Sequence, residues 1–186
     1  MATNVANHSS PQVANTVEYF QTYHRDGQIE GLHPRHMVHK QGLWHKSAQV
    51  FVFNGQDELL VQKRAAHKDL YANQWDYSVG EHVQPNESFV AGALRGLKEE
   101  LNIELEVADL QPLGEERWVT FKGMDRVDRE IQQAFSCRWD GAVRWDVNEV
   151  QFVHFIQLDH LNQWINMAPA EFTPWFADNL VEFGWR

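Results

Sequence analysis

The chain has 186 residues, enough for one domain with a buried core, and its 43% hydrophobic and 23% charged residues are ordinary for a globular protein. A formal net charge of -10 argues against a nucleic-acid-binding surface, and no apolar run approaches the roughly 20 residues that a membrane helix needs. The single cysteine, Cys137, excludes an internal disulfide and is interpreted as a buried, inert thiol.

The predicted elements begin with a tail. Residues 1–14 are rich in Asn, Ser and Ala and lack the regions of a signal peptide, so we expect a loose tail on a cytoplasmic protein. Residues 15–186 contain no linker and no internal repeat, which predicts a single domain. A run of β-forming residues over 17–28 ends at an Asp-Gly turn signal, and residues 31–45 indicate a loop or a short helix. Two apolar runs joined by Asn-Gly-Gln-Asp predict a β-hairpin over 47–64.

One helix interrupts the strands in the middle of the chain. A short strand is predicted at 75–79 and a helix at 87–101, with Asn86 or Ser88 as its N-terminal cap. Residues 103–139 predict three strands. Turns near Gly114 and Gly123 are expected to separate these strands. A strand at 149–158, a short helix at 159–169 and a longer closing helix at 170–186 are predicted to follow. Strands dominate this pattern, which predicts the α+β fold class.

The helix predicted at 87–101 contains two glycines, Gly92 and Gly96. Its apolar residues fall on one face, whereas both glycines lie on the side that carries Glu99 and Glu100. Each interior glycine costs about 1 kcal/mol relative to alanine. A loop, a ligand or a bridging metal must therefore approach this bare strip, and the sequence leaves these alternatives open.

The spacing of charged residues around this helix resembles the Nudix box, the signature of a family of metal-dependent hydrolases. Counted from Glu87, Arg95 falls in the arginine place of the box, and Glu99 and Glu100 fall in its paired glutamate places. Residues 16–156 look most similar to the branch related to isopentenyl-diphosphate isomerase. The resemblance implies a Nudix-type α/β/α sandwich around a mixed β-sheet. It also implies a hydrolase that cleaves a diphosphate linkage in a small molecule, such as a nucleoside diphosphate derivative, with Mg²⁺ or Mn²⁺ as cofactor.

Three residues depart from the pattern of the box. Gly96 stands where the family usually has a glutamate, and Asn102 replaces the glycine that usually ends the helix. Glu81 occupies the place of the opening glycine. We interpret the first and third departures as linked: Gly92 and Gly96 make room for Glu81, a carboxylate moved from the helix to the loop. The missing helix glutamate also keeps open a second function, a catalytically impaired Nudix-fold module that binds a phosphorylated ligand or partner.

The expected metal ligands are the oxygen atoms of Glu99 and Glu100, followed by those of Glu81. Carboxylate oxygens are the ligands that Mg²⁺ prefers in proteins, and Mn²⁺ would fit equally well. Arg95 lies four residues before Glu99, so we expect its guanidinium group to orient that carboxylate during catalysis.

Acidic and basic side chains outside the helix supply further candidates. Asp128 and Glu130 alternate along a predicted strand, so both point to one face. Either could hold metal or act as the general base, unless both are simply exposed strand charges; we assign Asp128 to metal and Glu130 to catalysis. Lys63, Arg64 and Lys68 follow the predicted hairpin and are candidates for binding the phosphates, with a solvated basic surface as the alternative.

Histidines and one glycine decide how the chain relates to the isomerase branch. His45 and His82 match places where that branch has metal-binding histidines, whereas His36 and His39 do not align cleanly. Gly80 occupies the place of the catalytic cysteine, so isomerase activity is not expected. The eight Trp residues mostly predict core, although exposed aromatics of the closing helix would suit a homodimer. The other expected partner is a small-molecule diphosphate substrate, with no nucleic acid and no membrane.

Overall fold

The computed structural model describes residues 17–68, 70–123 and 126–186. The tail predicted at 1–14 lies outside these residues, so the division into a tail and one domain stays a prediction. Among the described helices, none is long and apolar enough to cross a membrane.

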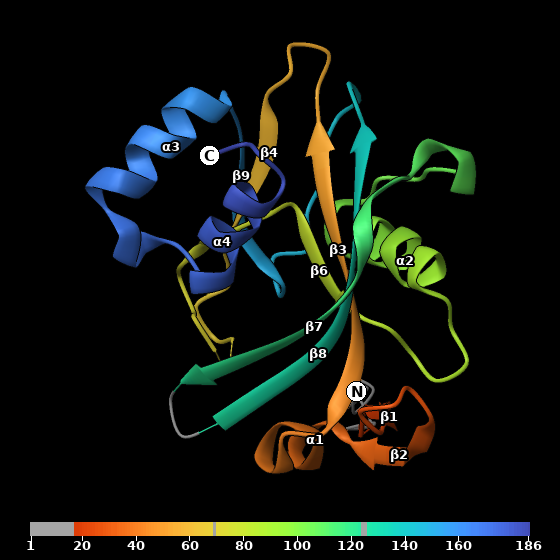
Figure 1. Cartoon of the computed structure of the whole chain (residues 1–186). Helices are drawn as coiled ribbons and strands as arrows, with labels where there is room; N and C mark the ends of the chain where they lie inside the picture. The colour runs from red at the N-terminus through yellow and green to blue at the C-terminus, as the bar shows by residue number, and fades with distance from the viewer. Residues whose placement is uncertain (1–16, 69, 124–125) are drawn as a thin grey trace, which may run out of the picture.

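The described residues form a nine-stranded mixed sheet with helices on both of its faces (Figure 1). In chain order the elements are β1 (Tyr19–Tyr23), β2 (Ile29–Pro34), α1 (Arg35–Gln41), β3 (Trp44–Phe53), β4 (Leu59–Arg64), β5 (Trp75–Asp76), β6 (Val79–His82), α2 (Phe89–Leu101), the 3-10 turn η1 (Val107–Asp109), β7 (Gln111–Gly123), β8 (Arg126–Arg138), β9 (Val150–Ile156), α3 (Leu158–Met167), the 3-10 turn η2 (Pro169–Glu171) and α4 (Pro174–Glu182). This mixture confirms the predicted α+β class.

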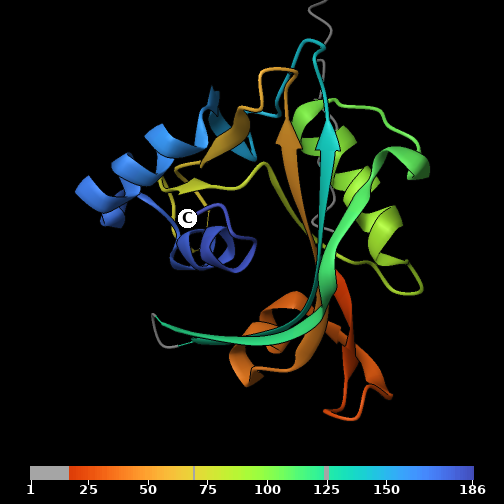
Figure 2. The ribbon, with the colours of Figure 1, turned by 45° about the horizontal axis from the view of Figure 1, so that its top comes forward.

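Strand β3 is the centre of the sheet. It pairs in antiparallel fashion with β1, β4 and β6, and in parallel with β8 along its whole length of 10 residues. Strand β7 pairs with β8, and β9 pairs with β4. Helix α2 covers one face of the sheet, whereas α3 and α4 cover the other (Figures 1 and 2). The predicted α/β/α sandwich around a mixed sheet is therefore confirmed.

Alternation along β3 divides the core between the two faces. Ala48, Val50 and Val52 pack with the apolar residues of α2, whereas Phe51 packs with those of α3 and α4. All four side chains are completely buried. Because successive side chains of a strand point to opposite faces, one apolar run stabilises both layers of helices.

Helix α2 has the caps that hold its two ends. The Ser88 hydroxyl accepts a hydrogen bond from the N–H of Ala91 at 3.1 Å, which satisfies a donor of the first turn. Asn102 ends the helix in the left-handed conformation, with φ 52°. Of the two predicted N-terminal caps, Ser88 is right and Asn86 is wrong, because Asn86 lies in the preceding turn with φ 65°.

The two glycines of α2 have different neighbours. A Cβ atom at Gly96 would lie 2.8 Å from Val79 Cγ1 and 2.9 Å from Glu81 Cβ, so any larger residue would displace side chains of β6. A Cβ atom at Gly92 would meet two other side chains at 3.3 Å. The interpretation that the glycines make room for Glu81 is therefore confirmed for Gly96 and wrong for Gly92.

Two predicted segments differ from the observed elements. The three strands predicted at 103–139 are two long strands, β7 and β8, preceded by η1. Gly114, with φ 69°, lies inside β7 where the pairing register shifts, so it accommodates a bulge instead of a turn. The closing helix is also shorter than predicted, because α4 begins only at Pro174 and has 9 residues against 10 in α3.

Candidate functional site

A cavity of about 560 Å³ is lined by side chains from α1, β6, α2, β8 and α4. The sequence-predicted site residues that line it are Arg64, Lys68, Glu81, His82, Arg95, Glu99, Glu100, Asp128 and Glu130. The structure thus places most of the predicted site, drawn from distant parts of the sequence, around one space. His45 is 1% exposed and reaches the same region through its contact with Asp128.

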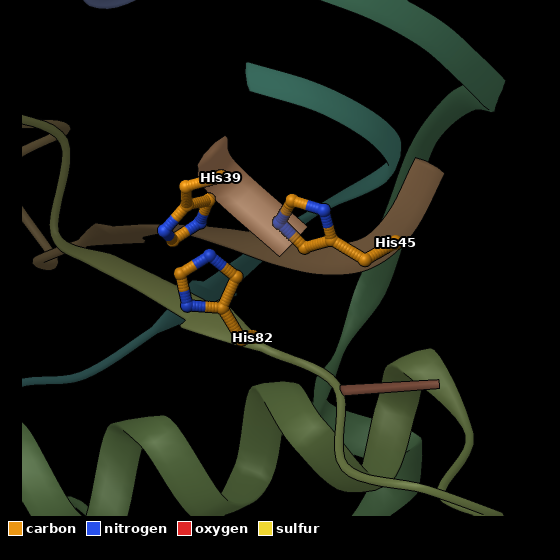
Figure 3. Close-up of side chains that lie close together, drawn as sticks. All are labelled: His39, His45 and His82. Carbon is orange, nitrogen blue, oxygen red and sulfur yellow. The ribbon is translucent and has the colours of Figure 1, made fainter. Parts of the chain in front are cut away.

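Three histidines from three elements meet at one side of this cavity. His39 comes from α1, His45 from β3 and His82 from β6, and their rings point toward one another (Figure 3). The ring centroids lie 5.1 to 5.6 Å apart, and one nitrogen of each ring lies within 4.8 Å of the others. This spacing is short enough for all three imidazoles to bind one metal ion.

Two carboxylates complete this histidine cluster. The Asp128 carboxylate lies 3.7 Å from His45 Nε2 and 3.9 Å from His39 Nε2, and Glu130 Oε1 lies 3.8 Å from His82 Nε2. Asp128 and Glu130 share one face of β8, as their alternation predicted. The five side chains together, which we call the histidine–carboxylate cluster, offer three imidazole nitrogens and two carboxylates.

Sheet pairing explains why these residues meet. The parallel register of β3 with β8 places His45 directly opposite Glu130. The antiparallel register of β3 with β6 places Ser47 opposite His82. The Ser47 hydroxyl donates to Glu130 Oε2 at 2.7 Å, and Gln132 Nε2 donates to the same oxygen at 2.6 Å, so this carboxylate has a fixed orientation.

The cluster fits a divalent cation. Burial lowers the pKa of His82 well below its ordinary value, with His45 as the next cause, so this imidazole is neutral, the form that binds metal. Burial, followed by the charge of Glu130, raises the pKa of Asp128 to about 8. The buried atoms His45 Nε2 and Asp128 Oδ1 have no hydrogen bond within the described residues. An ion held between nitrogen and oxygen donors would satisfy both atoms.

Carboxylates from β6, from α2 and from the turn between them form a second group around Arg95. This guanidinium lies 3.2 Å from Glu81 Oε2, 3.3 Å from Glu99 Oε2 and 2.9 Å from Glu87 Oε2, and it donates to the carbonyl of His82 at 2.8 Å. The predicted contact between Arg95 and Glu99 is present. Arg95 also contacts Glu81, which lies in strand β6 and not in a loop as predicted, so this contact connects β6 with the helix.

Glu100 differs from Glu99 in its surroundings. Glu100 is 7% exposed and accepts a hydrogen bond from Gln62 Nε2 at 3.1 Å, whereas the Glu99 side chain is 60% exposed. Burial, and then the charge of Glu81, raises the pKa of Glu100 to about 8. Among the described residues, two groups of side chains have donor atoms close enough together to hold a metal ion, and both groups contain histidine. Glu81, Glu99 and Glu100 line the same cavity but form no such group.

Only two of the three predicted phosphate-binding residues line the cavity. Arg64 and Lys68 line the cavity, and the Lys68 ammonium pairs with Glu149. Lys63 does not line it, because neighbouring residues of β4 point to opposite faces; its Nζ instead lies 5.9 Å from the ring centroid of Trp75. The prediction for Lys63 is therefore wrong.

The NUDIX domain model, one of the models that describe protein families, matches residues 43–176. The chain belongs to the NUDIX domain family. The resemblance seen in the box helix is thus confirmed over a much longer stretch than the helix itself.

Curated relatives of this NUDIX chain carry an isomerase name. It is 28% identical to the isopentenyl-diphosphate Delta-isomerase of Serratia proteamaculans, with 86% of this chain and 87% of the relative covered. It is 30% identical to the isopentenyl-diphosphate Delta-isomerase 2 of Photorhabdus laumondii, with 75% and 77% covered. The predicted relation to this branch is confirmed at the level of sequence similarity.

Solved structures show the same fold. A protein from Deinococcus radiodurans superposes with a TM-score of 0.65 at 22% identity, covering 81% of this chain and 90% of that chain. The MutT protein from Methanosarcina mazei gives 0.60 at 22% identity, covering 76% and 93%. At this identity the likeness describes the fold alone.

Residues that sequence reasoning missed also line the cavity of this NUDIX domain. His39 is one: the sequence left its alignment open, and a buried position on α1 brings its ring to the cluster, whereas His36 is exposed. Asp76 and Trp175 are two others, and the Trp175 indole donates to the Asp76 carboxylate at 2.9 Å. A short helix carrying two histidines was the available signal for His39. No local signal pointed to the pair of Asp76 and Trp175.

The buried Asp76 carboxyl gives a pH prediction. Burial raises its pKa from 3.8 to about 6, opposed first by Arg64. Because the folded-state pKa exceeds the unfolded one, Asp76 favours folding while protonated, and this contribution is lost as pH rises through 6. We expect the free energy of unfolding of the wild type, minus that of Asp76→Asn, to fall by roughly 1 kcal/mol between pH 5 and pH 7.

Urea denaturation of both proteins at several pH values measures this difference, and effects of other titrating groups cancel in the subtraction. A difference that grows with pH would show that the folded-state pKa is depressed instead.

Proposed function

We propose that this NUDIX domain is a divalent-metal-dependent hydrolase that cleaves a diphosphate linkage in a small molecule. The observation that supports it most is the histidine–carboxylate cluster, which shares one cavity with Glu81, Glu99 and Glu100 and with the cations of Arg64 and Lys68. A diphosphate carries several negative charges, so a site that cleaves it needs metal ligands and cationic side chains around one space.

The histidine–carboxylate cluster would hold Mg²⁺ or Mn²⁺ in this proposal, and the glutamates of α2 and β6 line the same cavity beside it. A bound ion would neutralise phosphate charge and lower the pKa of a water molecule. Arg64 and Lys68 face the cavity and would bind the phosphate oxygens. Glu130 would accept the proton of the attacking water, and the hydrogen bonds from Ser47 and Gln132 that orient its carboxylate support this role.

Glu81 would take the place of the glutamate that is missing at Gly96. The side chain of Glu81 occupies the space that a Cβ atom of residue 96 would need, and its carboxylate contacts Arg95 beside Glu99. The Glu81 side chain is only 16% exposed, and its charge is the second cause, after burial, of the raised pKa of Glu100, which also supports a role for Glu81 in this part of the cavity.

Isomerase chemistry of the kind named for the relatives is not favoured. Gly80 has no side chain to donate or accept a proton, and a Cβ atom there would lie 3.1 Å from the Tyr77 ring. Cys137 does not line the cavity but packs in the core beneath α2, where burial raises the pKa of its thiol to about 12.

The test is metal-dependent turnover. The purified protein is incubated with nucleoside diphosphate derivatives, dinucleoside polyphosphates and isopentenyl diphosphate, with and without Mg²⁺ or Mn²⁺, and released phosphate and monophosphates are measured. We expect cleavage of at least one substrate only with metal. We also expect Glu130→Gln to lower kcat by about 10²–10⁴-fold, as loss of a general base does.

The matched control is Glu104→Gln, which changes an exposed carboxylate paired with Lys98 away from the cavity. It should leave kcat unchanged. Metal-dependent binding of diphosphates without any turnover would instead favour the impaired binding module.

A further inference from the structure

Asp76 is a buried carboxylate that joins three separate segments of the chain. Its side chain is 3% exposed and lies at the end of β5. Oδ1 accepts hydrogen bonds from the Thr173 hydroxyl at 2.9 Å, from Trp175 Nε1 at 2.9 Å and from the Tyr77 backbone N–H at 3.0 Å. Oδ2 accepts from Arg64 at 3.4 Å. A buried charge with this many donors is expensive to assemble, which indicates a defined task.

These bonds fix the orientation of Trp175. Its indole carries a single N–H donor, and that donor is used by Asp76. Tyr71 and Phe121 contact the indole edge to face, with ring centroids at 4.8 Å and 5.4 Å. The ring is therefore held by one polar anchor and by two aromatic neighbours, and it lines the cavity.

The other residues that contact Asp76 differ in whether they line the cavity. Arg64 balances the carboxylate charge, donates to the carbonyl of Leu70 at 3.2 Å and lines the cavity, as does Trp175. Thr173 binds the same carboxylate but does not line the cavity. Of the three side chains that donate hydrogen bonds to Asp76, those of Arg64 and Trp175 thus belong to residues that line the cavity, and that of Thr173 does not.

The indole approaches the cavity from a different side than the histidine cluster. Trp175 belongs to α4 and His39 to α1, and in the view of Figure 1 the long hairpin of β7 and β8 passes between these two helices. The cavity therefore has metal-binding groups contributed from one direction and an aromatic wall contributed from another.

We propose that Asp76 is a positioning residue that holds the Trp175 indole against the cavity, where the ring packs on the organic group of the diphosphate substrate. This inference rests on the proposed function and narrows its substrate class. Because the indole N–H is already used, Trp175 offers only its ring, so the group it contacts presents an apolar or aromatic face. Recognition at this wall depends on packing, with no hydrogen bond from Trp175.

Binding measurements separate this role from a merely structural one. Titration calorimetry with Mn²⁺ present would use three non-cleavable probes: methylenediphosphonate, which has no organic group, its nucleoside ester and its branched alkyl ester. We expect Trp175→Ala to weaken binding of at least one ester by about tenfold and to leave methylenediphosphonate unchanged. The ester affected distinguishes a flat base from an alkyl chain.

Asp76→Asn and Trp175→Phe should weaken that same ester, the second because phenylalanine keeps a ring but loses the anchor. In the double variant Asp76→Asn with Trp175→Ala, the loss should equal that of Trp175→Ala alone, because Asp76 acts through the indole. Thr173→Val is the matched control: it removes a bond to the same carboxylate and should lower the melting temperature without changing ester affinity.

Two outcomes would overturn the inference while leaving the proposed function intact. In the first, Asp76→Asn and Trp175→Phe lower stability but bind every ester like the wild type. In the second, the losses of Asp76→Asn and Trp175→Ala add. If the wild type does not bind methylenediphosphonate with Mn²⁺, the proposed function itself fails, and this inference fails with it.

Discussion

His39→Ala is expected to weaken binding of Mn²⁺ by more than about 100-fold, because it removes one of three imidazoles that face a common point. The variant also removes an imidazole nitrogen that lies 3.9 Å from the Asp128 carboxylate. Electron paramagnetic resonance of Mn²⁺ titrations and calorimetry measure the affinity directly, and they need no knowledge of the substrate.

The same helix supplies the control for this variant. His36 lies one turn earlier on α1 but is exposed and outside the cluster, so His36→Ala should bind Mn²⁺ like the wild type. Equal affinities for the His39 and His36 variants would remove the basis for a histidine-containing metal site.

Gly96→Ala is expected to destabilise the protein by about 1–3 kcal/mol, although glycine-to-alanine changes inside helices usually stabilise by roughly 1 kcal/mol. The sign reverses because the new Cβ atom would lie 2.8 Å from Val79 and 2.9 Å from Glu81. The displacement of Glu81 should also lower metal-dependent turnover by about 10²-fold or more, as loss of a catalytic group does. Thermal unfolding and kcat measure the two effects.

Gly92→Ala provides the comparison, because its Cβ atom would meet side chains only at 3.3 Å. It should be nearly neutral in stability and should leave turnover unchanged. Glu81→Gln should lower turnover as much as Glu100→Gln does. A silent Glu81→Gln variant would mean that Gly96 only accommodates a structural side chain.

Local sequence signals predicted the parts of the fold that local physics determines. Ser88 and Asn102 cap α2 because a hydroxyl satisfies the first turn and asparagine tolerates a left-handed φ. The Gly114 prediction failed because a glycine with positive φ suits both a turn and a bulge, and only the pairing of β7 with β8 distinguishes them.

The candidate site was partly predictable for the same reason. Glu99, Glu100 and Arg95 lie on one helix, so their spacing alone places them together. The cluster around His45 and the anchoring of Trp175 depend on contacts between distant segments, which no short window of sequence records. Lys63 was misplaced because a strand that is buried on both faces gives no signal for which face meets the cavity.

The parallel pairing of β3 with β8 has a consequence for how the chain folds. The bond from Ser47 to Glu130 connects residues 83 positions apart, and the loop between them contains β4, β5, β6, α2 and β7. Closing so long a loop is slow, because its entropic cost is met before the new contacts stabilise it. Asp128 and Glu130 reach His45 only after that step, so competence to bind an ion should be among the last properties acquired during refolding.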